Sequence, residues 1–281
     1  MESNKKRAIE QIVDVSIRSF ADGLLTRYTN EVDDPAGVIN SKKNNCFIAE
    51  LGEEFMLYSA LVRSFDSAFG GVLERMGNSI AKITFETTNQ IDSYILPAQL
   101  DKIRELIDSY STDAQHKVAP LVEHYSNYSC IKPVDISSFR RTHITDHCFY
   151  DSEKDIYYLI ELKAGGDLDN KKAPSEKNQL LVEYFMLKNK ILSEGKHSEI
   201  KLFFGTAYNK NGEGNEWKQG SVKACFAEEE LLIGKDYWNF ICADEDGFDV
   251  VFNQYKQSCQ SIKEMLLEVK RMYFRNENNI W

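Results

Sequence analysis

Long apolar runs are what this sequence of 281 residues most clearly lacks. No stretch approaches the ~20 consecutive apolar residues that a membrane-spanning helix requires. Residues 1–25 have no apolar segment like that of a secretory signal peptide, and their acidic residues argue against a transit peptide. We therefore expect a cytoplasmic protein whose chain opens with an amphipathic helix.

Cysteine is also sparse, and its spacing excludes a common type of metal site. The six cysteines include no CxxC pair. A chain of this length without a secretory signal does not need disulfides for stability. We therefore expect reduced, structural thiols.

Signature motifs of several other protein classes are absent. The sequence contains no P-loop and no dinucleotide-binding fingerprint. Residues 164–170, AGGDLDN, resemble part of a calcium loop but do not complete the twelve-residue EF-hand pattern. We expect the two glycines of this segment to let the chain turn closely past another backbone.

Positive charge is in deficit, with 34 Lys and Arg residues against 44 Asp and Glu residues and a formal net charge of −10. A generic nucleic-acid binder would normally be basic, so this balance argues against one. It does not exclude an enzyme that grips DNA with a local basic surface, because such an enzyme needs carboxylates as metal ligands.

Hydrophobic periodicity predicts a mainly helical first part of the chain. Apolar residues recur at steps of three and four over 55–80 and again over 98–118, and a polar loop covers 29–47. The length fits one large domain. We divide it into a helical part (about 1–130), a catalytic core (about 131–210) and a recognition and C-terminal part (about 208–281).

The middle of the chain changes to a strand pattern. Residues 143–150 and 156–163 are rich in aromatic and β-branched types around a polar turn, which predicts a β-hairpin. A helix is predicted over 174–195 and an apolar strand over 199–207. A strand, a helix and a further strand imply a parallel crossover, so we predict an α/β fold with a mixed central sheet flanked by helices.

The hairpin brings two acidic residues together if its turn is as short as predicted. When Asp151 pairs with Ile156, Asp146 falls opposite Glu161, with Cβ atoms about 4.5–5.5 Å apart. Alternation along a strand places Glu161 and Lys163 on one face. The sequence therefore predicts two carboxylates and one lysine at a single place on the sheet.

Such a cluster suits a metal-dependent nuclease. Adjacent carboxylates repel, and a hard cation such as Mg²⁺ would neutralise them and still accept a phosphate. Lys163 could orient or deprotonate an attacking water, or stabilise phosphate charge. The alternative is a solvated ion pair on an edge strand. The apolar run IYYLI before Glu161 favours a central strand.

The pattern of Asp146, fourteen residues, then Glu161-Leu162-Lys163 resembles the PD-(D/E)xK nuclease superfamily. The stretches RSFDSAFGGVLER, ELKAGGDLDNKKA and EEELLIGKDYWNFI resemble the TdeIII-like type II restriction endonucleases. Thr145 stands where the motif has proline. That departure keeps Asp151 and Asp135 open as rivals to Asp146.

The resemblance implies Mg²⁺-dependent cleavage of double-stranded DNA at a short palindromic site by a homodimer, with GGNCC as the site of close relatives. It implies Asp146, Glu161 and Leu162 as metal ligands and Lys163 as the catalytic residue that positions water. It also implies an acid on the preceding helix, for which Glu74 is our candidate. Two alternatives stay open: a repair or junction-cutting nuclease with the same core, and a non-catalytic DNA-binding module.

Several basic residues near this cluster are candidates for contacts with DNA phosphates, which position the duplex without reading it. They are Arg140, Arg141, Lys171, Lys172, Lys177, Lys210 and Lys218. The loop 208–220 has a composition suited to base readout. For a helix predicted over 253–274 we expect core packing first and a dimer contact second. His143 and His147 are expected together on the face opposite Asp146, in packing or near DNA rather than on zinc.

Overall fold

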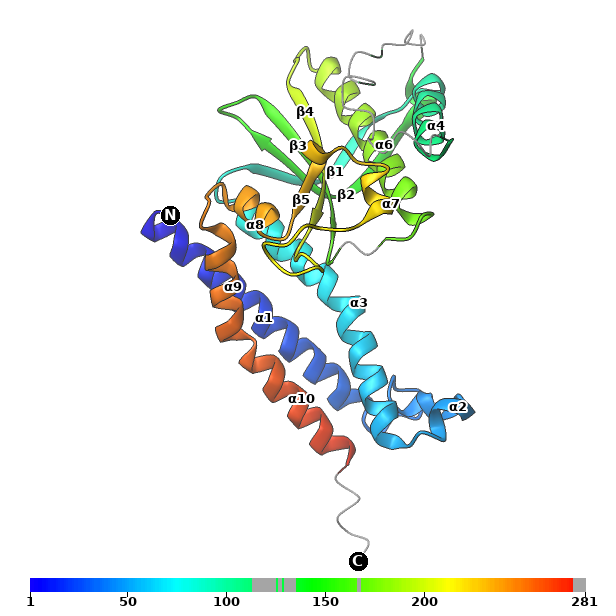
Figure 1. Cartoon of the computed structure of the whole chain (residues 1–281), viewed down its shortest axis with the longest axis vertical. Helices are drawn as coiled ribbons and strands as arrows, with labels where there is room; N and C mark the ends of the chain where they lie inside the picture. Colours follow the sequence, from blue (N-terminus) through cyan, green and yellow to red (C-terminus); the bar gives the residue numbers. More distant parts are fainter. Residues whose placement is uncertain (113–124, 126–127, 129–134, 166–167, 275–281) are drawn as a thin grey trace, which may run out of the picture. The chain divides into compact units, whose positions relative to one another are not determined.

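The structure is a computed structural model, which describes residues 1–112, 125, 128, 135–165 and 168–274. Its contacts divide the chain into two compact units (Figure 1). One contains Met1–Met76 with Asp249–Trp281, and the other contains Gly77–Phe248. The two ends of the chain thus belong to the same unit.

The first unit is helical. Its elements are α1 (Ser3–Glu31), η1 (Asn40–Asn44), α2 (Cys46–Ala49), most of α3 (Glu53–Ala81), most of α9 (Gly247–Ser258) and α10 (Gln260–Tyr273). One side of α1 is buried at residues four apart, such as Ile9, Val13 and Ile17. The predicted α3 stripe forms a helix, although Phe55 and Val62 are exposed.

The C-terminal segment differs from its prediction in one respect. Instead of one helix over 253–274, two helices meet at Cys259. Ile262 and Val269 are buried, as expected for core packing, and α10 lies along α1 (Figure 1).

In the part of the chain that the structure describes, no helix is long and apolar enough to cross a membrane.

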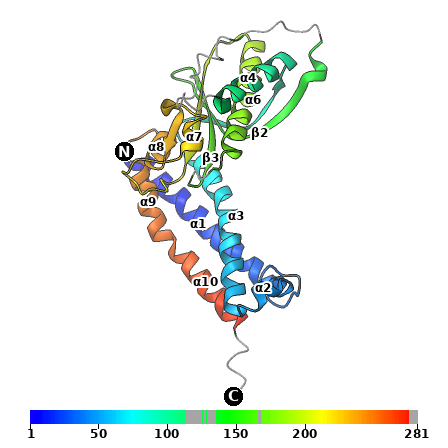
Figure 2. The same ribbon diagram turned by 45° about the vertical axis from the view of Figure 1, so that its right-hand side comes forward.

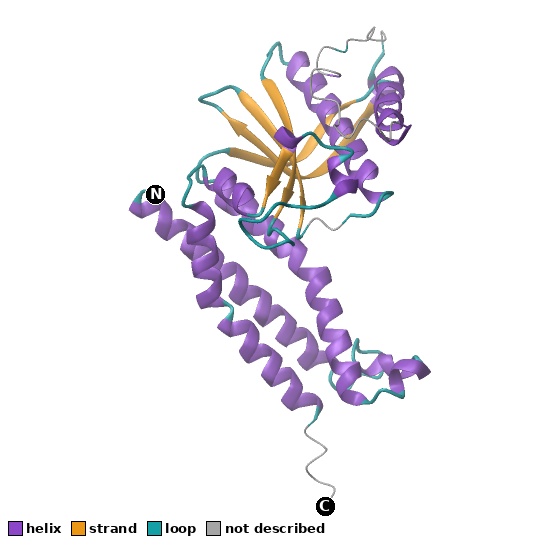
Figure 3. Cartoon of the chain, viewed as in Figure 1, coloured by secondary structure: helices purple, strands orange, loops and turns teal. Residues whose placement is uncertain are grey.

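The second unit contains a five-stranded sheet in the order β1-β2-β3-β4-β5 (Figure 3). The strands are β1 (Glu86–Tyr94), β2 (Arg140–Asp151), β3 (Ile156–Lys163), β4 (Glu199–Thr206) and β5 (Leu231–Ile233). β1, β2 and β3 are antiparallel neighbours, whereas β4 is parallel to β3 and β5 to β4. The predicted mixed sheet is therefore confirmed, and β3 is its central strand.

Two helices cover one face of this sheet. They are α4 (Pro97–Thr112) and α6 (Lys172–Ser193), which lie side by side in both Figure 1 and Figure 2. Leu180, Phe185 and Leu159 are fully buried between α6 and the sheet. Asp169 precedes α6, and its Oδ1 accepts hydrogen bonds from the N–H groups of Lys171 and Lys172 at the start of the helix.

The opposite face packs against different elements. The last residues of α3, from Gly77 on, contact this face through Asn78, which meets His147. The helix α8 (Lys235–Cys242) contributes Tyr237 and Phe240, whose rings pack against His147 and Tyr158, respectively. Among its described residues the unit also contains the short elements η2 (Ser137–Phe139), α7 (Gly220–Lys223) and η3 (Glu228–Glu230). Both faces of β3 are thus covered, which explains its nearly continuous apolar sequence.

Candidate active site at the β2–β3 hairpin

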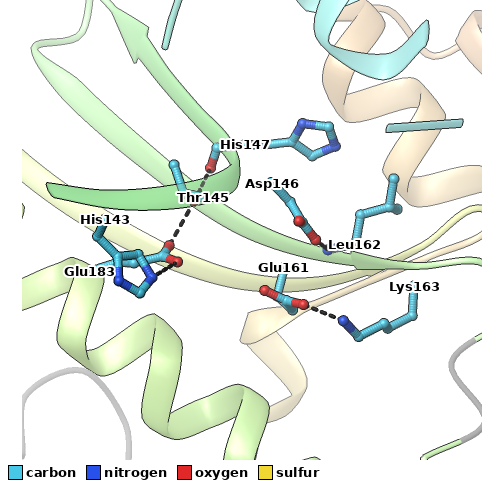
Figure 4. A network of polar contacts seen from close by, with 8 residues as sticks. All are labelled: His143, Thr145, Asp146, His147, Glu161, Leu162, Lys163 and Glu183. Atoms are coloured by element: carbon cyan, nitrogen blue, oxygen red, sulfur yellow. Dashed lines mark hydrogen bonds and ion pairs between the residues drawn. The ribbon is translucent and has the colours of Figure 1, made fainter. Parts of the chain in front are cut away.

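The predicted hairpin register is the observed one. Asp151 pairs with Ile156, and the ladder continues to His147 opposite Ile160. Asp146 and Glu161 are the next residues on the two strands, and their carboxyl groups lie close together in Figure 4. The structure thus brings together the two acids that the sequence predicted to meet.

Hydrogen bonds fix the three central groups of the site. The backbone N–H of Leu162 donates to Asp146 Oδ2 at 3.0 Å. Lys163 Nζ donates to Glu161 Oε1 and lies 3.3 Å from Glu176 Oε1. Glu161 is buried, at 8% exposed, whereas Asp146, Lys163 and Glu176 are partly buried.

Burial and neighbouring charges shift the pKa values of the three groups. Burial and the charge of Asp146 together raise the pKa of Glu161 to about 8, although Lys163 opposes the shift. Burial also raises the pKa of Asp146. Burial lowers the pKa of Lys163, but the neighbouring carboxylates outweigh it and the net shift is upward. Lys163 is therefore held as an ammonium ion.

Glu176 is a member of the site that the sequence reasoning missed. It lies in the first turns of α6, and its charge acts on Asp146, Glu161 and Lys163 alike. A signal for it existed in the sequence. Glu176 precedes the buried Leu180 by four residues, so both lie on the side of α6 that faces the sheet.

The residues present fit a hard divalent cation. Within the described ranges no group of three or more His, Cys, Asp or Glu side chains is arranged as a metal site. However, Mg²⁺ uses one or two carboxylates and keeps several waters. Asp146 and Glu161 supply that donor set, and a cation would relieve the repulsion that raises the pKa of Glu161. Leu162 could ligate only through its carbonyl, since its N–H binds Asp146.

The strand β2 is continuous from Arg140 to Asp151, but its pairing with β1 is interrupted beside Asp146. Thr88 of β1 pairs with Cys148, but Gln90 pairs with Ile144, so one residue of β1 faces three of β2. The prediction that His143 and His147 share a face was therefore wrong. His143 Nε2 lies 3.0 Å from Glu183 Oε1 on α6, whereas His147 Nε2 meets the Tyr237 hydroxyl on the other face.

His147 lies in the protein interior, between the polar side chains of Asn78 and Tyr237. It is fully buried, and burial lowers its pKa to about 3. Its Nδ1 lies 3.0 Å from Asn78 Oδ1. The expected packing role fits this environment better than a position near DNA.

Lys177 is the one predicted phosphate contact that the structure contradicts. Its side chain is fully buried, and Nζ donates to Glu230 Oε2 at 2.6 Å. The ammonium also lies 4.7 Å from the ring centroid of Phe226. Burial lowers the pKa of Lys177. Lys177 therefore belongs to an internal ion pair, because the helix turns this position away from the surface.

The other basic candidates are exposed, which leaves their predicted role untested. They are Arg140, Arg141, Lys171, Lys172, Lys210 and Lys218. Glu74 lies in α3 and belongs to the other compact unit, so its membership of the site stays a prediction.

Both rival acids have local structural roles. Asp151 accepts hydrogen bonds from Lys154 Nζ and from two backbone N–H groups in the hairpin turn. Asp135 caps Ser137. Asp146 is therefore the acid that joins Glu161.

The predicted recognition loop is exposed at its tip and anchored at its base. Residues 210–216 are exposed, whereas Trp217 is buried in the core of the sheet. Glu213 anchors the loop, because its carboxylate accepts hydrogen bonds from the N–H groups of Asn209 and Lys235. Gly165 allows a close approach, but the neighbour is Tyr208: a Cβ at Gly165 would lie 2.5 Å from the Tyr208 hydroxyl.

A mixed sheet flanked by helices, with two acids and a lysine on adjacent central strands, defines an α/β protein of nuclease type. The model of the type II restriction endonuclease family HinfI matches residues 5–259, and the chain belongs to this family. It is therefore a type II restriction endonuclease, a site-specific DNA hydrolase. No curated protein and no solved structure matches the chain.

Proposed function

We propose that this endonuclease has a PD-(D/E)xK active site and cleaves both strands of DNA with Mg²⁺ held by Asp146 and Glu161. The observation that carries the proposal is the meeting of these two carboxyl groups beside Lys163 on the central strands. A bound Mg²⁺ would supply Lewis-acid activation of the scissile phosphate and of an attacking water.

The protein groups divide the remaining work. Asp146 and Glu161 hold the cation, with the Leu162 N–H fixing one oxygen of Asp146. Lys163 is placed to orient water and to offset charge on the phosphate, because its upward-shifted pKa keeps it protonated. Glu176 restrains the ammonium from the side of α6.

We propose a homodimer acting in the cytoplasm on a short palindrome, with GGNCC, the site implied by the TdeIII-like stretches, as the first sequence to test. A two-fold symmetric dimer places one active site on each strand of a palindrome. Sedimentation of the protein with an uncut oligonucleotide duplex in Ca²⁺ measures this: two chains per duplex are expected, and one chain per duplex would contradict it.

Purified protein incubated with plasmid and Mg²⁺ tests the proposed reaction. Discrete bands, absent in EDTA, are expected, and sequencing the fragment ends gives the site. A smear, or a preference for branched substrates, would instead indicate a repair or junction-cutting nuclease. Bands that persist in EDTA would contradict the metal requirement.

A further inference from the structure

The interruption of the β1–β2 pairing leaves the proposed metal ligand outside both strand ladders. Neither the β1–β2 register nor the β2–β3 register pairs Thr145 or Asp146. In a regular strand these adjacent side chains would point to opposite faces. Here Thr145 reaches Glu183 of α6 and Asp146 reaches Glu161, whose partner Lys163 also contacts α6. Something other than strand pairing must therefore hold Asp146 in place.

One hold comes from α6. Glu183 is 2% exposed, and its two oxygens are shared between two β2 side chains (Figure 4). Thr145 Oγ1 donates to Oε2 at 2.7 Å, and His143 Nε2 lies 3.0 Å from Oε1. A buried carboxylate is costly unless its oxygens are hydrogen-bonded, so this contact fixes the segment before Asp146 firmly to α6.

A second hold comes from the opposite face. Asn78 Nδ2 donates to the backbone carbonyl of Asp146 at 3.0 Å, which satisfies a group that no ladder pairs. Asn78 Oδ1 can only accept, so His147 carries its hydrogen on Nδ1 and accepts the Tyr237 hydroxyl at Nε2, 2.8 Å away. Gly77 leaves room for the Tyr237 hydroxyl that ends this row of hydrogen bonds, because a Cβ at position 77 would lie 2.3 Å from it.

We infer that Glu183 and Asn78 are positioning residues that clamp β2 from its two faces at this interruption and so fix Asp146 against Glu161 for metal binding. The inference rests on the proposed metal-binding role of Asp146. Each acts through a neighbour: Glu183 through Thr145, and Asn78 through the Asp146 carbonyl.

Thr145→Val removes one hydrogen bond with little change of shape, and Asn78→Ala removes the other hold. Thr145→Ser keeps the hydroxyl and serves as the conservative variant. Asn189→Leu is the matched control, because Asn189 also lies buried on α6 and donates to a strand carbonyl, that of Tyr94, away from the site. Calorimetric titration with Mg²⁺ or Ca²⁺ gives metal affinity without DNA, and unfolding in EDTA gives stability without metal.

Thr145→Val and Asn78→Ala are expected to weaken metal binding about 10- to 100-fold, as loss of partners that orient a metal ligand does. Thr145→Ser and Asn189→Leu should bind metal like the parent, although Asn189→Leu loses stability in EDTA. Parent-like metal affinity in both Thr145→Val and Asn78→Ala would overturn the inference. If the parent binds no metal, or Asp146→Asn binds it equally well, the proposed function itself fails.

Discussion

At the scale of single residues, the site combines two acids that repel each other, Asp146 and Glu161, with one lysine, Lys163, that attracts both. Glu161 has a pKa raised to about 8 by burial and by Asp146, while Lys163 bonds to Glu161 and contacts Glu176. The acids suit cation binding, and the ammonium suits the reaction that follows it. The two roles should therefore be separable by substitution.

Lys163→Met tests this separation. We expect cleavage to fall by about 10³-fold or more, which corresponds to roughly 4 kcal/mol of transition-state stabilisation. Metal affinity measured by calorimetry should stay within about threefold of the parent, since both carboxylates remain. A variant that loses metal affinity and cleavage in the same proportion would place Lys163 among the groups that hold the cation.

Cysteine reactivity tests burial at a second residue. Burial raises the pKa of Cys225 to about 11, whereas Cys46 is exposed. At pH 8 iodoacetamide should label Cys46 in the folded protein and Cys225 only after unfolding in urea, as read from peptide masses. Equal labelling of the two in the folded protein would contradict the core described around Cys225.

The raised pKa of Cys225 also makes the stability of the folded protein depend on pH. The folded protein keeps a proton on Cys225 that the unfolded chain releases near pH 8.5. This contribution to stability is therefore complete below about pH 8.5 and declines as the pH rises toward 11. In Cys225→Ala, the decline over this interval should be smaller than in the parent.

At the scale of elements, α6 links the core to the site. Its apolar residues pack on the sheet, Glu176 and Glu183 face the active-site strands, and Lys177 bonds to Glu230. Lys177 therefore stabilises the fold through a buried ion pair, and the contact with DNA phosphates predicted from the sequence is wrong.

Lys177→Met should lower the free energy of unfolding by about 3–5 kcal/mol, because Glu230 is then a buried carboxylate without its cation. Urea denaturation measures the change. Adding Glu230→Gln should recover much of the loss, since the neutral amide can still accept from the Ala227 N–H through its oxygen and donate to the Tyr125 hydroxyl through its nitrogen. If Lys177→Met is as stable as the parent but binds DNA more weakly, the surface role would be reinstated.

Helices and strands with a strong apolar period were predictable from the sequence, whereas the polar strand β1 at the edge of the sheet was not. The helix α6 and the strands β2, β3 and β4 lie where their apolar patterns placed them, and the short turn at 151–155 fixed the register that joins Asp146 to Glu161. The strand β1 was missed because ETTNQIDSY is mostly polar, as befits an edge strand. The three-residue β5 is too short to show a period.

The interruption of the β1–β2 pairing could not be read from the sequence either. It depends on which residues of β1 oppose β2, and those lie about fifty positions away in the chain. The interruption reverses the face of His143 but leaves the β2–β3 register intact up to His147. The prediction that Asp146 meets Glu161 is therefore confirmed, and the prediction that the two histidines share a face is wrong.

At the scale of the whole molecule, an acidic protein must bind a polyanion. With a net charge of −10, contact with DNA depends on local basic groups, and Lys171 and Lys172 are exposed at the start of α6, near Glu176 in sequence. Each phosphate contact contributes about 0.9 to the slope of log affinity against log salt concentration.

Lys171→Ala with Lys172→Ala should therefore reduce that slope by up to about 2 and weaken binding to all duplexes alike, as measured by fluorescence anisotropy in Ca²⁺. Lys196→Ala is the control, because Lys196 is exposed beyond the other end of α6. An unchanged slope in the double variant would remove these lysines from the DNA interface.

The most direct measurement of the central claim is single-turnover cleavage of plasmid DNA with Mg²⁺ by Asp146→Asn and by Glu161→Gln. Both substitutions keep the size of the side chain and remove one negative charge from the β2–β3 pair. Each variant should cut at least about 10³-fold more slowly than the parent while unfolding in EDTA at the same temperature or higher, because the repulsion between the acids is gone. Cleavage at the parent rate by either variant would contradict the account.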